Sequence, residues 1–594
     1  MKSFFKYVFA TVVGLILFCL LFFLLTLVSL SAMMMTDSSV RVEDNSVMTI
    51  RLSGILADRS QDNGIMGLLA GEKTAGLSVE QLLASIDRAK ENEKVKGIYI
   101  EGGMLVGAQP AALEEVRNKL LDFKKSGKFI LAYADSYTQG SYYLCSVADS
   151  VVVNPQGVID WEGLSTTVAY YKNLLDKIGV KAQVYKVGAY KSAVEPFITQ
   201  EMSVENKEQL EVFQQEVWKK MREDVGASRK IAANQLDTLA NMGLMLADPS
   251  LYLKTRLVDK LAYTDEVPKM ICYMMKDVDN PKDYHTISSA DMAKTARLTP
   301  KDPSGNVIAV YFAEGEIGQI SGAALSSEGI MANKVCEDLR KLTDDEQVKA
   351  IVLRVNSPGG SAYDSEQIWH QVMETKKKKP VIVSMGALAA SGGYYISCAA
   401  DWVVAQPTTI TGSIGIFGVI PEAQELLNEK LGVSLQTVKT NEFAGMGIDM
   451  MPFTEAEGAL LQGCVNRGYE LFTKRVADGR HMKQDNVKKI GEGRIWTGIH
   501  AKQLGLVDQL GGLDDAIAVA KKRSNTTECS VVSYPEQKTM MERLLAEVNN
   551  KDTYADAKLR EYFGDYALMF QSLRSLASRD RLQASLPFWM KFNL

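Results

Sequence analysis

The feature that most constrains this 594-residue chain is an internal duplication, in which the same order of short motifs occurs twice about 252 positions apart. The motifs of the two copies are Val95–Ile100, Gly140–Tyr143, Ala148–Val152 and Leu257–Asp259 in the first, and Val348–Leu353, Gly392–Tyr395, Ala400–Val404 and Leu506–Asp508 in the second. Self-similarity over this distance predicts two domains of one fold, arranged in tandem.

Within each copy, short β-branched apolar runs alternate with longer segments whose apolar residues recur every three or four positions. Runs of five or six apolar residues are typical of parallel strands buried on both faces, and the longer segments of amphipathic helices. Ser78 with Gln81 three residues later is a helix start signal. The fold class predicted from this rhythm is α/β, built from βαβ units.

Changes in pattern divide the chain into four segments. We expect an amino-terminal anchor at residues 1–36, a first half at 46–300, a second half at 304–530 and a helical tail at 531–594. The junction falls in the cluster of proline, aspartate and glycine at Thr299–Gly305, which is typical of a linker. In the tail, Met540, Leu544, Leu545 and Val548 would share one helix face.

The amino terminus predicts a membrane anchor. Lys2 and Lys6 precede Tyr7–Met35, a stretch without any charged side chain. About 20 apolar residues suffice to cross a bilayer, whereas a cleaved signal peptide usually has an apolar run of only about 7 to 15. The flanking charges favour a cytoplasmic amino end. Cleavage near Ser29 or Ser31 is the alternative, and both readings place the body outside the cytoplasm.

Composition excludes several classes of function. The chain has 67 basic and 72 acidic residues, a net charge of -5 and no long basic stripe, so nucleic acid is not an expected partner. Its four histidines form no HExxH motif, and its seven cysteines have neither CxxC nor zinc spacing. We therefore expect no metal and no cofactor, and the sequence nominates no disulfide.

Two clusters of small residues in the second half suggest a site for acyl transfer. Asn356–Ser361 contains adjacent glycines directly after a predicted strand, where backbone N–H groups can face a ligand; a simple turn is the alternative. Ser391 follows the next strand and precedes Gly392 and Gly393. A serine at a helix start can be merely an N-cap, but the same position suits a nucleophile beside an oxyanion hole.

The first half contributes a candidate base. Lys191 lies among small and aromatic residues in Gly188–Phe197. Most lysines are solvated surface residues, so this one can act as a base only if burial lowers its pKa from about 10.4. By the repeat offset, Ser391 falls opposite Gln139, and Lys191 opposite a position near Ala444. Each half lacks what the other has, so the sequence predicts one site divided between the two halves.

These motifs together resemble the signal peptide peptidase A family in its long, two-domain form. The resemblance spans nearly the whole chain and rests on the segments Gly188–Phe197, Ser357–Gly360, Ala390–Tyr394, Thr411–Gly418 and Gly493–Gly498. It implies tandem crotonase-like or Clp-protease-like domains behind one transmembrane helix. It also implies a Ser/Lys-dyad serine protease of the bacterial inner membrane, with a periplasmic body, that degrades cleaved signal peptides.

The resemblance also assigns roles to residues. Ser391 would be the nucleophile and Lys191 its base, Gly359 and Gly392 would supply oxyanion-hole N–H groups, Gly360 would support that turn, and Ser413 would hydrogen-bond the lysine. The expected partners are peptide substrates, membrane lipid around the anchor, and three further copies in a homotetramer. Two other functions stay open from the residues alone: an acyl-CoA enzyme of the crotonase fold, and a catalytically silent membrane scaffold.

Overall fold

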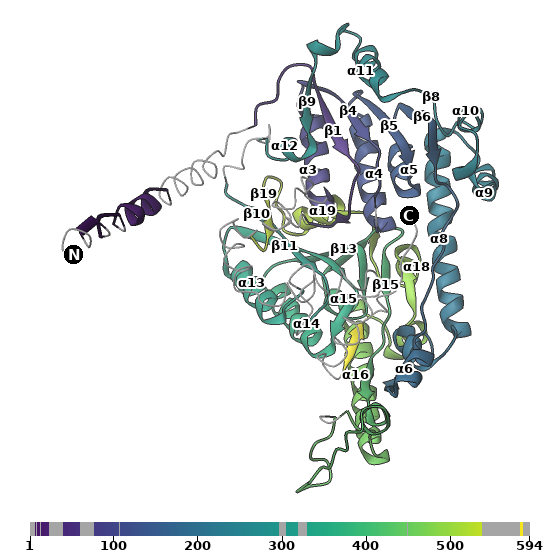
Figure 1. The fold of residues 1–594 in the computed structure, drawn as a ribbon, viewed down its shortest axis with the longest axis vertical. Helices are drawn as coiled ribbons and strands as arrows, with labels where there is room; N and C mark the ends of the chain where they lie inside the picture. Colours follow the sequence, from purple (N-terminus) through teal and green to yellow (C-terminus); the bar gives the residue numbers. More distant parts are fainter. Residues whose placement is uncertain are drawn as a thin grey trace.

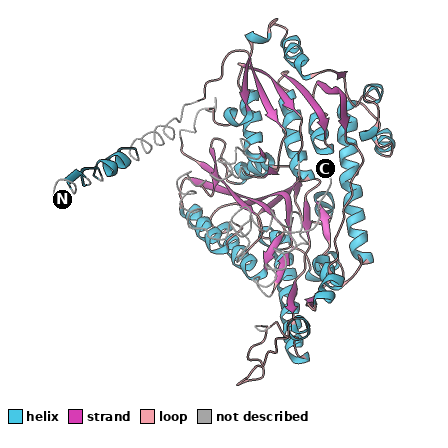
Figure 2. Ribbon diagram, viewed as in Figure 1, coloured by secondary structure: helices cyan, strands magenta, loops and turns pink. Residues whose placement is uncertain are grey.

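The computed structural model describes residues 6–7, 9–11, 13–22, 40–59, 77–105, 107–295, 304–318, 329–447, 450–536 and 582–585. Within these ranges the chain forms two α/β halves, one above the other in Figure 1, with the helix-and-strand composition shown in Figure 2. The predicted duplication and the α/β class are therefore confirmed.

The first half is built on a parallel sheet of order β8-β6-β5-β4-β1-β9. Its strands are β1 (Ser46–Arg51), β4 (Val95–Glu101), β5 (Phe129–Tyr137), β6 (Ser150–Ile159), β8 (Lys260–Leu261) and β9 (His285–Ser288), beside a separate short pair of β2 (Leu56–Ala57) and β3 (Leu77–Ser78). Ile130, Leu131 and Ala132 on β5 are all fully buried, as expected for a strand covered on both faces.

The helices of the first half are α3 (Val79–Glu91), α4 (Pro110–Lys124), α5 (Gln139–Cys145), α6 (Lys172–Ile178), α7 (Glu195–Ile198), α8 (Val204–Arg229), α9 (Ala233–Ala240), α10 (Ser250–Lys254), α11 (Val267–Met275) and α12 (Ser289–Met292), with short 3-10 turns at Ser192–Val194, Leu244–Leu246, Thr264–Glu266 and Pro281–Asp283. Of these, α3, α5, α11 and α12 contact this sheet, whereas α6 and α7 contact the strand at residues 181–186. The start signal at Ser78 is confirmed, because its hydroxyl accepts a hydrogen bond from the Gln81 N–H as the N-cap of α3.

The second half repeats the arrangement. Its sheet has the order β17-β15-β13-β11-β10-β19, and β14 joins β13 to β18. The strands are β10 (Val307–Glu314), β11 (Val348–Ser357), β13 (Val381–Ala390), β14 (Trp402–Ala405), β15 (Ile410–Gly412), β17 (Ile495–Thr497), β18 (Gln509–Leu510) and β19 (Ser530–Tyr534); the helices are α13 (Ala332–Asp344), α14 (Ala362–Lys376), α15 (Gly392–Ser397), α16 (Glu455–Arg480), α17 (Gln484–Ile490), α18 (Gly498–Gln503) and α19 (Leu513–Arg523), with a π-helical turn at Leu426–Lys430. All the sheet pairings are parallel except that of β15 with β17.

The correspondence between the halves extends to single interactions. The Arg229 guanidinium at the end of α8 binds the Asp259 carboxylate at 2.8 Å, and Arg480 at the end of α16 binds Asp508 at 2.6 Å. Both helices are 26 residues long and end in a left-handed residue. A paired ion at the same place in each half is what a duplicated architecture predicts.

The two halves share contacts as well as a fold. Strand β7 (Lys181–Lys186) of the first half pairs antiparallel with β16 (Phe417–Glu422) of the second. Between the sheets, the buried Arg354 guanidinium binds the carboxylates of Asp58 at 2.8 Å and Glu115 at 2.6 Å. One apolar core contains residues of both halves, from Ile98 and Leu113 to Ile308 and Ala516.

A strand of the carboxyl-terminal tail completes a four-stranded sheet. β20 (Gln583–Ser585) lies between β12 (Gly359–Ser361) and β16, antiparallel to both. The predicted helical face of Met540, Leu544, Leu545 and Val548 lies outside the described residues, and so does most of the predicted junction. The strand was not foreseen.

At the amino terminus, residues 13–22 are helical and extend away from the body (Figure 1, dark purple). Much of Tyr7–Met35, with Ser29 and Ser31, lies outside the described residues. Within the described ranges, no helix has the length and apolar character needed to cross a membrane. The transmembrane helix therefore stays a prediction.

Candidate active site

Ser391 occupies the sharp turn between β13 and α15. Its backbone has φ 56° and ψ -114°, a region that residues with side chains seldom adopt. The Ser391 N–H donates to the Gly412 carbonyl at 2.8 Å, which fixes the turn against β15. Although Ser391 stands at the N-cap position, its hydroxyl makes no capping hydrogen bond. Strain without a capping role is typical of a residue held for its chemistry.

Lys191 reaches the same point from the first half. Its Nζ lies 2.8 Å from Ser391 Oγ, 3.1 Å from Ser413 Oγ and 3.3 Å from the Ser413 carbonyl oxygen. The Phe417 ring, whose centroid is 5.7 Å from Nζ, closes another side. The structure thus brings together Lys191, Ser391 and Ser413, three residues singled out from the sequence.

The environment of Lys191 changes its protonation. The side chain is 1% exposed, and Ser391 and Ser413 are fully buried. Burial lowers the pKa of the Lys191 amine to about 7, because the ammonium loses its hydration and gains only hydroxyl and carbonyl oxygens in exchange. A substantial fraction of the amine is therefore neutral near pH 7 and able to accept a proton.

The glycine turn that precedes α14 lies beside Ser391. Gly359 has φ +97°, and the point where its β-carbon would stand is 2.6 Å from the Gly392 nitrogen. Gly392 is the first residue of α15, so its N–H has no acceptor within the helix. The Gly359 N–H donates to Ser357 Oγ at 3.1 Å. Gly360, with φ +155°, is the middle residue of β12 and forms a parallel β-bridge with Ile317.

Comparison with known proteins identifies the family. The pattern of Peptidase family S49 matches residues 122–277 and 373–527, one match in each half. This chain belongs to Peptidase family S49. It is a serine peptidase. The Clp protease pattern matches residues 324–409 of this S49 peptidase, in agreement with the α/β fold of the second half.

Relatives of the S49 peptidase are similar over most of their length. Protease 4 of Salmonella typhi is 34% identical over 553 residues, which cover 89% of this chain and 86% of that protein. Protease 4 of Haemophilus influenzae is 34% identical over 83% of this chain and 82% of the relative. The chloroplastic serine protease SPPA of Arabidopsis thaliana is 30% identical over 82% of this chain and 70% of the relative.

The first half of this S49 peptidase has a different residue where the second has Ser391. Gln139 begins α5 there; its amide donates to the Gly163 carbonyl at 3.0 Å, and its carbonyl oxygen accepts from the Gly163 N–H at 2.9 Å. The side chain thus ties α5 to a neighbouring loop. Its amide is no nucleophile, so this position in the first half has no counterpart to Ser391.

Sequence reasoning missed a residue that links the two halves near the lysine. Gln209 on α8 donates through its amide to the Tyr190 carbonyl at 3.2 Å and to Ser192 Oγ at 3.1 Å. Its carbonyl oxygen accepts from the Ile495 N–H at 3.2 Å. One side chain therefore holds both neighbours of Lys191 and the strand β17. A glutamine inside an amphipathic helix carries no sequence signal for such a role.

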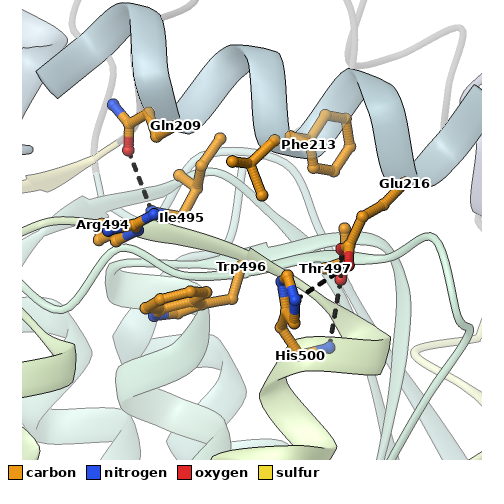
Figure 3. Close-up of a pocket in the computed structure, with 9 residues that line it drawn as sticks. Gln209, Phe213, Glu216, Arg494, Ile495, Trp496, Thr497 and His500 are labelled. Carbon is orange, nitrogen blue, oxygen red and sulfur yellow. Dashed lines mark hydrogen bonds and ion pairs between the residues drawn. The ribbon is translucent and has the colours of Figure 1, made fainter. Parts of the chain in front are cut away.

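A hollow beside this link lies between α8 and β17 (Figure 3). Glu216 on α8 accepts a hydrogen bond from Thr497 Oγ1 and pairs with His500 Nε2 at 2.9 Å. The residues that line the hollow include neither Lys191 nor Ser391. These contacts join the halves and involve neither Lys191 nor Ser391.

Proposed function

We propose that this S49 peptidase is a membrane-anchored endopeptidase in which Ser391 is the nucleophile and Lys191 the general base. The observation that carries the proposal is a buried amine with a lowered pKa, 2.8 Å from the hydroxyl of a strained serine. Proximity and a pKa near the working pH are the two requirements for a base that activates a nucleophile.

The reaction would follow the usual course of acyl transfer. Neutral Lys191 takes the hydroxyl proton as Ser391 Oγ attacks the peptide carbonyl, and the resulting ammonium protonates the departing amine. Lys191 then activates the water that hydrolyses the acyl-enzyme. Ser413 orients the amine through its hydroxyl. The Gly392 N–H, and the Gly359 N–H once it turns from Ser357, would stabilise the oxyanion.

We propose cleaved signal peptides and similar apolar peptides as substrates. The uncharged stretch Tyr7–Met35 supports an anchor in the bacterial inner membrane with the body on the periplasmic side, where such peptides remain after export. A homotetramer is proposed with it. Native mass spectrometry measures the assembly, and extraction of membranes at alkaline pH, with and without residues 1–36, tests the anchor.

The dyad is tested by labelling with a fluorophosphonate, which reacts with activated serines. Wild type should label at Ser391, and Lys191→Ala should label at least about 10²-fold more slowly, because removal of the base leaves the hydroxyl protonated. Lys186→Ala, five residues earlier on β7, is the matched control and should label like wild type. Equal labelling of all three proteins would contradict the assignment of Lys191.

The substrate class is tested separately by mass spectrometry of an apolar signal peptide incubated with wild type and with Ser391→Ala. Fragments should appear only with wild type. The two other functions left open by the sequence make different predictions, since a scaffold neither labels nor cleaves. An acyl-CoA enzyme would act on a thioester and spare the peptide.

A further inference from the structure

Arg494 immediately precedes β17 and lines the hollow between the halves (Figure 3). Its backbone supports the active site from the second half, because its carbonyl oxygen accepts a hydrogen bond from the Ser413 N–H at 2.7 Å. Ser413 has a left-handed backbone with φ 49°, and its hydroxyl and carbonyl oxygens both face the Lys191 amine. The backbone of Arg494 therefore helps to hold the residue that orients the base.

The side chain of Arg494 reaches the lysine segment Gly188–Phe197 of the first half. Its guanidinium donates through Nη1 to the Tyr190 hydroxyl at 3.2 Å and through Nη2 to Glu208 Oε1 at 2.9 Å. The Tyr190 hydroxyl in turn donates to Glu208 Oε2 at 3.2 Å. These three side chains form a closed triangle of hydrogen bonds, the Arg494 triangle, across the two halves.

Aromatic contacts add to the Arg494 triangle. The guanidinium carbon of Arg494 is 4.7 Å from the centroid of the Tyr190 ring and 4.7 Å from that of Trp496. A planar guanidinium can bind a carboxylate and lie against aromatic rings at the same time, which suits an ammonium less well. The Arg494 side chain is only 20% exposed. The arginine thus fixes Tyr190, the residue directly before Lys191.

The two residues before Arg494 pack directly on the lysine segment. The Tyr190 N–H donates to the Glu492 carbonyl at 3.1 Å. The point where a β-carbon on Gly493 would stand is 2.7 Å from both the nitrogen and the α-carbon of Lys191. So close an approach leaves no room for water between the two backbones. The burial of Lys191 therefore depends on these two segments staying together.

We propose that Arg494 is a positioning residue that acts through Tyr190 and Lys191. By holding Tyr190 in the Arg494 triangle, it keeps the lysine segment closed against residues 492–494 and keeps water from the amine. The inference rests on the proposed function of Ser391 and Lys191. When the triangle is broken, the two segments separate, water reaches the amine and the ammonium form becomes more stable. A smaller fraction of the enzyme then has a neutral base.

The rate of fluorophosphonate labelling of the purified full chain, measured against pH, tests the proposal. The wild-type midpoint is expected near the Lys191 pKa of about 7. In Arg494→Met the midpoint should rise by at least about half a pH unit, because the entering water stabilises the ammonium. The value of kcat for peptide cleavage should fall about tenfold with little change in KM, because a displaced base slows the chemical step more than the binding of peptide.

Two further variants separate positioning from charge. Arg494→Met removes a positive charge, and that loss alone would raise the pKa of a nearby amine. Tyr190→Phe changes no charge but removes the hydroxyl that joins Arg494 to Glu208, and Arg494→Lys keeps the charge but loses the planar contact. Both should raise the midpoint. Combined with Arg494→Met, Tyr190→Phe should add little, because both break the same triangle. Tyr190→Phe also decides the matter if Arg494→Met does not fold.

Arg222→Met is the matched control. Arg222 lies over the Trp218 ring at 5.8 Å and pairs with Asp237 at 3.0 Å. Its side chain is 21% exposed, nearly the same as that of Arg494. These three control residues lie on α8 and α9 of the first half. The control loses the same kinds of contact as Arg494→Met and should keep the wild-type midpoint and kcat.

The outcomes distinguish this inference from the function on which it rests. If Lys191→Ala labels slowly, but Arg494→Met and Tyr190→Phe keep the wild-type midpoint and kcat, the positioning role alone is overturned. A midpoint that rises in Arg494→Met, but not in Tyr190→Phe or Arg494→Lys, would overturn it as well, since the charge alone would account for the change. If Lys191→Ala labels like wild type at every pH, the proposed function is wrong and the inference fails with it.

Discussion

At the scale of single residues, two buried basic side chains, Arg354 and Lys191, differ in the groups that surround them. Arg354 is 1% exposed and has two carboxylates as partners. Lys191 is equally buried, yet its amine faces two hydroxyls, a carbonyl oxygen and an aromatic ring. Burial without a countercharge destabilises the charged form of a basic side chain and lowers its pKa. Side chains with shifted pKa values concentrate at functional sites.

The first prediction concerns pH. Lys191 must be neutral to accept a proton, and burial lowers its pKa to about 7. The value of kcat/KM should therefore rise as pH increases through about 7 and level off above it. Ser413→Ala should move the midpoint to lower pH, because the ammonium loses one acceptor. The rate of peptide cleavage, measured against pH for both proteins, checks the two midpoints. A wild-type midpoint near the ordinary lysine pKa of about 10.4 would refute the prediction for Lys191.

The second prediction concerns Gly359. In Gly359→Ala the new β-carbon would stand 2.6 Å from the Gly392 nitrogen, in the space that the Ala584 carbonyl occupies. We expect kcat/KM to fall about 10²-fold, because the clash displaces the turn and its N–H groups, which has the same effect as losing an oxyanion donor. Gly54→Ala is the control: with φ +82° and no heavy atom within 4 Å of the added carbon, it introduces similar backbone strain without a clash. Comparable losses in both variants would refute the role of the turn.

At the scale of elements, the lysine segment depends on the helix α8 and the strand β17. Gln209 binds the Tyr190 carbonyl, Ser192 and the Ile495 N–H, so it fixes Lys191 relative to the second half. The backbone at Gly493 packs closely against Lys191, because a β-carbon on Gly493 would lie 2.6 Å from Lys191 Cβ. The position of Lys191 is thus set by residues outside the segment that carries it.

The third prediction tests this positioning. Gln209→Leu should lower kcat about tenfold with little change in KM, because a displaced base affects the chemical step more than the binding of peptide. Gln214→Leu, on the same helix, removes a hydrogen bond to Thr166 and should leave kcat unchanged. Steady-state kinetics of the two variants decide the matter. A rise in KM alone for Gln209→Leu would indicate a merely structural role.

Elements differ in how far the sequence predicts them. The strands β4, β5, β11 and β13 were predictable because β-branched apolar runs recur in both copies, and α3 because Ser78 caps it. The pairing of β7 with β16 was not, since no local pattern encodes a partner in the other half. β20 has only three residues and no apolar period, so its place depends entirely on the strands beside it.

The candidate site was predictable in part for the same reason. Ser391 and the glycine turn follow buried strands, where small residues are conspicuous. Lys191 could be singled out only by comparing the copies and through the family resemblance. Its role as a base also requires burial, which the sequence does not show. Gln209 has no pattern of its own, because its contribution depends on contacts between the halves. Phe417 lies in the segment Thr411–Gly418 that carries the resemblance, but its contact with Lys191 could not be read from that motif.

At the scale of the whole molecule, the two halves are joined through a buried ionic cluster. Asp58 and Glu115 from the first half bind Arg354 from the second, and Glu115 also accepts from the Leu513 N–H at 2.6 Å. Burial beside Asp58 raises the pKa of Glu314, at the end of β10, to about 7. The relative position of the halves, and with it the dyad, depends on this cluster.

The fourth prediction concerns its stability. Asp58→Ala leaves the Arg354 charge buried with one carboxylate fewer and should lower the free energy of unfolding by about 3 kcal/mol. Arg51→Met removes the exposed pair with Glu101 and should change it by less than about 1 kcal/mol. Chemical denaturation measures both. Similar small effects would show that the halves do not rely on the cluster.

The division of the dyad between the halves affects the enzyme during its own synthesis. Lys191 and Ser391 are 200 residues apart in the chain. At about 5 to 20 residues per second, the nucleophile leaves the ribosome roughly 10 to 40 seconds after the base. Under the proposed mechanism, a nascent polypeptide therefore cannot hydrolyse peptides until its second half has been made and folded.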